Sequence, residues 1–154
     1  MPVDSHVLTM YDRIVVPTDG SEGMDRVLAH AADLAGVHGA TLDFVYVVNA
    51  AAFANLPMET SWEGVRESLR EEGETALEAA EAAVEGVDTE RRMLDGGPAR
   101  EIVAYADGSG ADLVLMGTHG RGGINRILLG SVAERVVRRS PVPVLTVRVD
   151  GEEE

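Results

Sequence analysis

Glycine and hydroxyl residues gather in one stretch, GTHGRGGINRILLGS, at positions 117–131. Gly117, Gly120 and Gly130 have no side chains, so the backbone N–H groups beside them can come close to an anion. Ser131 adds a hydroxyl donor where a helix is expected to begin, with its unpaired N–H groups and positive dipole end. Arg121 adds a local positive charge. This pattern favours phosphate binding.

The residues around this stretch predict alternating strands and helices. β-branched and apolar runs predict strands over 14–16, 41–48, 89–94, 111–117 and 142–147. Apolar residues at helical spacing predict helices over about 22–37 and 59–84, from Pro98 onward, and from about 130 to 140. This alternation predicts an α/β fold with an open five-stranded parallel sheet and helices on both faces.

Side-chain positions follow from the same periodicities. The continuous apolar run over 111–117 predicts a central strand, whereas the polar strand over 89–94 is expected at an edge. Ser21 is the expected N-cap of the first helix, and Trp62 is expected to anchor the second helix by packing. Val132, Val136 and Val137 are expected to face inward on the last helix.

Open sheets of this kind bind ligands at the carboxyl ends of their strands, where the strand order reverses. Three segments are expected to meet there: PTD at 17–19, VVN at 47–49 and the glycine-rich stretch. The sequence therefore predicts one ligand site at this edge of the sheet.

Composition and charge exclude several classes of protein. The chain has 154 residues and no cysteine, which excludes disulfides and thiolate metal sites. Its 27 acidic and 13 basic residues, all arginine, give a formal net charge of -14, which disfavours binding to nucleic acid or anionic membrane. An acidic surface of this kind suits high salt, where self-repulsion is screened.

The chain also has no apolar segment of membrane-spanning length. We expect a cytoplasmic protein with a single domain over 1–149 and an acidic tail over 150–154.

Several motifs resemble those of the universal stress protein family over nearly the whole chain, from Asp12 to Val149. One is Gly, two residues, Gly, nine residues, then Gly and Ser or Thr, which Gly117, Gly120, Gly130 and Ser131 satisfy. Others are VPTDGS at 16–21, ADLVLMG at 111–117 and SPVPVL at 140–145. The resemblance implies the ATP-binding branch of the family and a homodimer formed through the last strand, Val142 to Val147.

The resemblance also implies which residues surround the nucleotide. Residues expected around the adenosine are Pro17, Thr18, Asp19, Val47, Met116 and Gly117. Residues expected around the phosphates are His119, Gly120, Arg121, Gly130, Ser131 and Val132. A magnesium ion would arrive with ATP and bind mainly phosphate oxygens, with Asp19 as a candidate ligand.

Alternative interpretations stay open at this point. Asp19 could serve only to cap a turn, and His119 fits a hydrogen bond to phosphate better than a general base. Common enzyme motifs, such as a P-loop or a nucleophile elbow, are absent from the sequence, and no catalytic residue is assigned. Three functions remain: an ATP-dependent regulatory dimer, a slow ATPase or phosphotransferase at the same site, and an interaction module that binds no nucleotide.

Overall fold

The computed structural model describes residues 10–49, 62–118 and 129–149. Within these ranges, strands and helices alternate, as the sequence predicts. The elements are β1 (Arg13–Pro17), α2 (Met24–His38), β2 (Thr41–Val48), α3 (Trp62–Ala83), β3 (Thr89–Asp95), α4 (Pro98–Gly108), β4 (Leu113–Gly117), α5 (Ser131–Arg139) and β5 (Val144–Val147).

The five strands form one parallel sheet in the order β3-β2-β1-β4-β5. The α/β fold predicted from the sequence is therefore confirmed, including the edge position of β3. The strand order reverses between β1 and β4, because β1 leads through α2 to β2 on one side and β4 leads through α5 to β5 on the other. This reversal marks the edge where ligands bind in such sheets.

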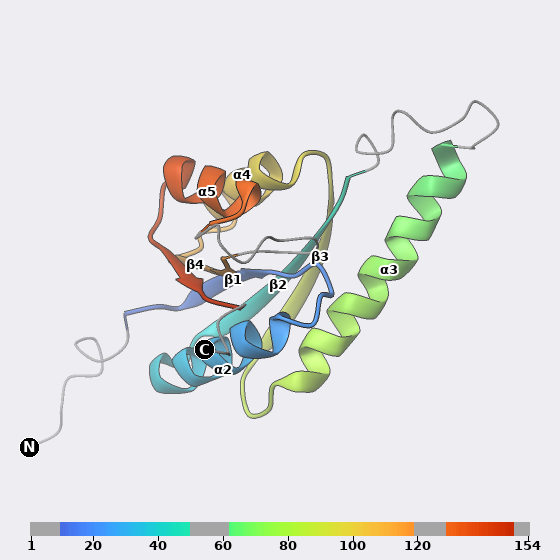
Figure 1. Cartoon of the computed structure of the whole chain (residues 1–154). Helices are drawn as coiled ribbons and strands as arrows, with labels where there is room; N and C mark the ends of the chain where they lie inside the picture. The colour runs from blue at the N-terminus through green and yellow to red at the C-terminus, as the bar shows by residue number, and fades with distance from the viewer. Residues whose placement is uncertain (1–9, 50–61, 119–128, 150–154) are drawn as a thin grey trace, which may run out of the picture.

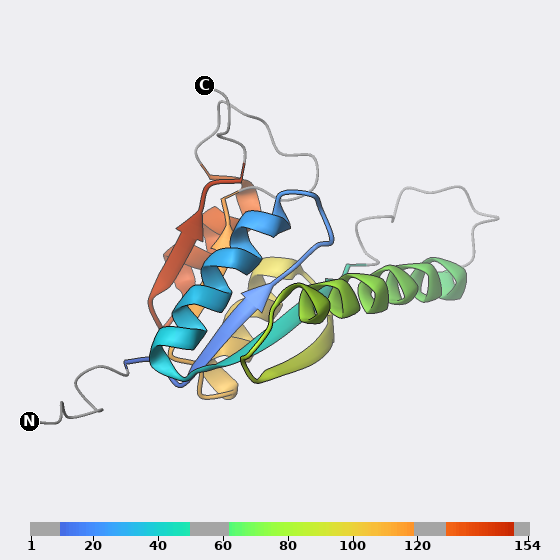
Figure 2. The same cartoon turned by 90° about the horizontal axis from the view of Figure 1, so that it is seen from below.

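Helices cover both faces of the sheet (Figures 1 and 2), with α2 and α3 on one face and α4 and α5 on the other. Successive residues of a strand point to opposite faces, so each central strand contributes to two separate apolar cores. Ile14 and Val16 pack beneath α2 and α3, whereas Val15 between them packs with the residues of α4 and α5.

The last helix departs in one detail from the sequence prediction. Ala133 and Val136 form its buried positions, whereas the side chain of Val137, expected inward, is 45% exposed. Helical geometry explains the error: residues three apart share a face, and the residue after Val136 is turned away from it.

Helix α3 packs on the sheet mainly over its second half, and Leu69 just before it is partly buried against the same core. Its buried residues begin at Gly73, and Figure 2 shows its first turns projecting past the rest of the described fold. A Cβ atom on Gly73 would lie 2.6 Å from the ring of Tyr46, so glycine permits the close approach. Trp62 is 51% exposed at the projecting end, and the prediction that it anchors the helix by packing is wrong.

Candidate functional site

The turn after β1 is held by short side chains that bond to its own backbone. Thr18 is buried, and its N–H donates to the carbonyl of Val45 at 2.8 Å. Its Oγ1 accepts from the N–H of Gly20 at 3.1 Å, and Asp19 Oδ1 accepts from the N–H of Ser21 at 2.9 Å. Gly20 has a φ of 77°, which glycine adopts without strain. Asp19 therefore does cap a turn.

Helix α2 begins later than the sequence predicts. Gly23 is its N-cap and Met24 its first residue, whereas the carbonyl of Ser21 accepts a hydrogen bond from the N–H of Met24 at 3.1 Å. The expectation that Ser21 caps the helix is wrong, because Ser21 lies in a turn that ends before the helix begins, two residues ahead of the N-cap. A polar turn of several residues therefore separates β1 from α2 at this edge of the sheet.

The chain leaves β4 and returns to α5 at the same point. The N–H of Thr118 donates to the carbonyl of Val147 at 2.9 Å, and the carbonyl of Thr118 accepts from the N–H of Gly130 at 2.7 Å. We call the Thr118–Gly130 hydrogen bond the neck. Thr118 is buried, and it was not singled out from the sequence; its signal was a polar residue directly after the buried strand. The neck fixes where α5 begins relative to the end of β4.

Helix α5 presents its amino end beside this neck. Gly130 is the N-cap, in an extended conformation, with no side-chain hydrogen bond to the cap. Ser131, the first helical residue, is exposed, and Val132 is half-buried. The first N–H groups of a helix have no partner within the helix and carry the positive end of its dipole. This end of α5 can therefore bind an anion.

The structure brings together most of the predicted site residues that it describes. Pro17, Thr18 and Asp19 lie at the carboxyl end of β1, and Met116 and Gly117 lie at the same end of the neighbouring β4. The two strands pair at Ile14–Leu113 and Val15–Val114, and each runs on beyond these pairs.

The remaining predicted residues either flank this edge or fall outside the description. Val47 lies near the carboxyl end of β2, the next strand along, and is half-buried. Gly130, Ser131 and Val132 lie at the start of α5. His119, Gly120 and Arg121 lie outside the described residues, as does the tail over 150–154.

Two kinds of feature are absent from the described part of the chain. No group of three or more histidine, aspartate or glutamate side chains there could hold a metal ion. No helix there is both long enough and apolar enough to cross a membrane.

Comparison with known proteins decides the family. The model of the universal stress protein family matches residues 10–148. The chain belongs to this family. The universal stress protein MJ0531 of Methanocaldococcus jannaschii is 45% identical over 141 residues, which are 90% of this chain and 83% of that protein.

Solved structures of this family share the fold. The structure of MJ0577, another universal stress protein of Methanocaldococcus jannaschii, matches with a TM-score of 0.81 and 29% identity, over 94% of this chain and all of that one. A universal stress protein in complex with cAMP matches with a TM-score of 0.67 and 28% identity, over 92% of this chain and 99% of that one. At least one similar family structure therefore holds an adenine nucleotide.

Proposed function

We propose that this protein binds ATP at the carboxyl ends of β1 and β4 and acts as a nucleotide-dependent regulatory homodimer. The observation that carries the proposal is the amino end of α5, held by the neck against the end of β4 at the point where the strand order reverses. A similar family structure in complex with cAMP supports an adenine nucleotide as the ligand.

The described residues fit the two ends of a nucleotide. Met116 and Val47 are apolar residues at the carboxyl ends of their strands, suited to the base and sugar. The N–H groups at the start of α5 suit the phosphates, because they donate hydrogen bonds without adding a side chain. Magnesium would bind phosphate oxygens, and Asp19, whose Oδ1 already accepts from Ser21, is the carboxylate at this edge that could assist.

The homodimer is proposed to form through β5. This strand lies at the edge of the sheet, and all four of its residues are half-buried in the single chain. An edge strand leaves one row of backbone N–H and C=O groups unpaired, and a second copy of the strand can pair with that row. Sedimentation of the purified protein tests this part of the proposal: a Leu145→Lys variant should sediment as a monomer, whereas the parent sediments as a dimer.

A thermal unfolding experiment with Mg-ATP tests the nucleotide site. We expect ATP at about 100 times its dissociation constant to stabilise the parent by about 2.7 kcal/mol, which raises the melting temperature by a few degrees. Gly130→Asp should remove most of this rise, because it puts a carboxylate at the phosphate site. Adenosine, which has no phosphates, should stabilise the parent and this variant equally.

The chain offers a matched control for this substitution. Gly97 is the N-cap of α4, is extended like Gly130, and has no atom within 4 Å of an added Cβ. Asp is favourable at an N-cap, so both variants should fold at least as well as the parent. Gly97→Asp should keep the full response to ATP. A parent free of bound nucleotide that shows no response would instead favour the interaction module, and steady release of ADP would favour the slow ATPase.

A further inference from the structure

A hollow lies at the end of the sheet opposite the proposed nucleotide site, where β1 and β3 begin and α4 ends. Its volume is about 360 Å³, within the usual range for sites that hold a small molecule. Its lining includes Arg13, Glu90, Arg92, Tyr105, Gly108 and Ser109. None of these residues belongs to the nucleotide site proposed above.

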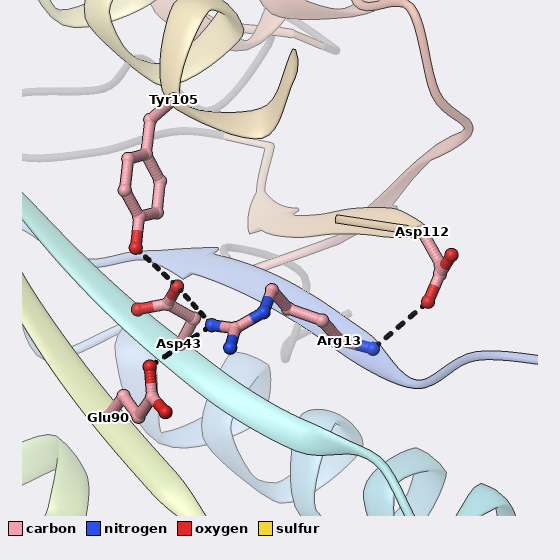
Figure 3. A network of polar contacts seen from close by, with 5 residues as sticks. All are labelled: Arg13, Asp43, Glu90, Tyr105 and Asp112. Carbon is pink, nitrogen blue, oxygen red and sulfur yellow. Dashed lines mark hydrogen bonds and ion pairs between the residues drawn. The ribbon is translucent and has the colours of Figure 1, made fainter. Parts of the chain in front are cut away.

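Four polar contacts hold one wall of this hollow (Figure 3). Arg13 Nη1 lies 2.8 Å from Asp43 Oδ2 and 3.1 Å from Glu90 Oε1, so it bridges two carboxylates. The hydroxyl of Tyr105 donates to Asp43 Oδ2 at 2.6 Å. The backbone N–H of Arg13 donates to Asp112 Oδ2 at 3.0 Å, which fixes the start of β1. The wall is therefore held in place without a ligand.

The protonation of Tyr105 keeps this wall intact. Burial, together with the hydrogen bond to Asp43, raises the pKa of Tyr105 above its ordinary value of 10.0. The hydroxyl therefore remains a donor near neutral pH, and its oxygen lone pairs remain able to accept.

Several polar groups in and behind the wall have bonding capacity left. Asp43 is fully buried, and its Oδ1 has no hydrogen-bond partner within the described residues. The buried Oγ of Ser109 also has none there. Native proteins rarely leave buried polar atoms unpaired, so each such atom needs an explanation. Ser109 lines the hollow itself, and a ligand or water placed there can supply its partner.

Arg92, which also lines the hollow, supplies a positive charge. Its guanidinium lies 5.5 Å from the centre of the Tyr105 ring and makes no ion pair with the carboxylates in the described ranges. The neighbouring residue on β3, Arg91, points to the other face and pairs with Glu74 and Glu81 on α3. Arg92 is thus free to bind a carboxylate group.

The carboxyl end of α4 supplies a partial negative charge. Gly108 and Ser109 close this helix, and the last carbonyl groups of a helix carry the negative end of its dipole. Glu90, half of whose side chain is exposed, adds a carboxylate to the lining of the hollow. These groups favour an ammonium group.

We propose that this hollow binds a small zwitterion of the amino-acid type, with its carboxylate on Arg92 and its ammonium group near Ser109 and Glu90. Charge balance supports this class. Arg13 and Arg92 are offset by Asp43 and Glu90, so a purely anionic ligand would meet two carboxylates and a purely cationic one would meet two guanidinium groups. A molecule that carries both charges matches both sides.

Titration of the isotope-labelled protein by NMR tests the ligand class. The probes are L-alanine, propionate and isopropylamine, which present both charged groups, the carboxylate alone and the ammonium alone. We expect L-alanine to produce saturable shifts at the amides of Arg92, Tyr105 and Ser109, and each single-charge probe to bind at least about tenfold more weakly. Propionate binding as tightly as L-alanine would overturn the zwitterion assignment, and no saturable shift with L-alanine would overturn the site.

Two arginine variants test the residue assignment. Arg92→Gln should weaken L-alanine binding about tenfold, because it removes one charge-assisted contact at an exposed position. Arg91→Gln changes the adjacent residue on the other face and should leave the binding unchanged. Both variants should keep the response to Mg-ATP, which makes this test independent of the nucleotide site. Equal loss of L-alanine binding in the two variants would contradict the proposal.

Discussion

The polar groups at the two ends of the sheet are of different kinds. At the carboxyl end, the polar groups are main-chain N–H groups and short side chains that bond to adjacent backbone, as in the turn of Thr18 and Asp19. At the amino end, they are long charged side chains that meet across three strands and a helix, with Asp43 buried at the centre. One end therefore depends on local turns, and the other depends on tertiary packing.

Because of this difference, we expect substitutions at the carboxyl end to affect mainly ligand binding and substitutions at the amino end to affect mainly stability. Backbone donors at the carboxyl end remain in place when a nearby side chain is replaced, so changes there should affect a ligand more than the fold. A buried carboxylate at the amino end loses its compensation when a partner is removed, so changes there should affect the fold first. Three substitutions test this contrast, starting with the one expected to be largest.

Arg13→Ala should cause the largest loss of stability. The substitution removes the cation from Asp43, whose side chain is 1% exposed, and leaves a buried charge without its partner. We expect the free energy of unfolding to fall by about 3 kcal/mol, measured by urea denaturation at high KCl concentration. The double variant Arg13→Met with Asp43→Leu should recover most of this loss, because it removes both charges. A single variant as stable as the parent would break the contrast.

Tyr105→Phe should cause an intermediate loss at the same end. It removes one hydrogen bond to a buried carboxylate that keeps its contact with Arg13, so we expect a loss of about 1.5 kcal/mol in the free energy of unfolding. Denaturation at neutral pH measures it. Arg92, which contacts the Tyr105 ring, keeps that contact in the phenylalanine variant.

The same variant should change the pH dependence of stability. Because the folded protein raises the pKa of Tyr105 above 10.0, the unfolded chain loses this proton first as the pH rises. The contribution of Tyr105 is therefore fully present below about pH 10 and is lost as the pH rises through the folded pKa. Stability measured across this alkaline range should fall more steeply in the parent than in Tyr105→Phe. Parallel curves would show that the hydroxyl is not coupled to Asp43.

Of the three substitutions, Asp19→Ala should lower the free energy of unfolding least. Its larger effect should be on the binding of ATP. The substitution removes a half-buried hydrogen bond within a local turn, which costs about 1 kcal/mol in the free energy of unfolding. The stabilisation by Mg-ATP should fall in the same variant, measured by thermal unfolding. Asp33→Ala, at an exposed position of α2, serves as the control and should change neither quantity. An Asp19 variant with full ATP response would remove this side chain from the proposed site.

The fold was predictable because its signals are local. The apolar run at 113–116 indicated a buried strand, and the polar strand predicted at 89–94 indicated an edge, as the sheet order confirms. The turn after β1 and the start of α5 at Ser131 followed from turn and glycine chemistry. Elements of this kind depend on residues near one another in the chain.

The amino-end network was not predictable in the same way. Its members come from positions 13, 43, 90 and 105, and only the folded sheet places them together. The available signal was Asp43 itself, a charged residue between Leu42 and Phe44 in an apolar strand. The exposure of Trp62 was missed for a related reason: periodicity gives the apolar face of a helix but not how far the sheet extends beneath it.

The neck has a consequence for how the protein can be altered. It is a hydrogen bond from the N–H of Gly130 to the carbonyl of Thr118, so it joins the residue after β4 to the residue before α5. The entropy of closing a loop grows slowly with its length, by roughly 0.6 kcal/mol for each doubling. A change in the number of residues between Thr118 and Gly130 should therefore lower the free energy of unfolding only slightly, as long as this hydrogen bond can still form.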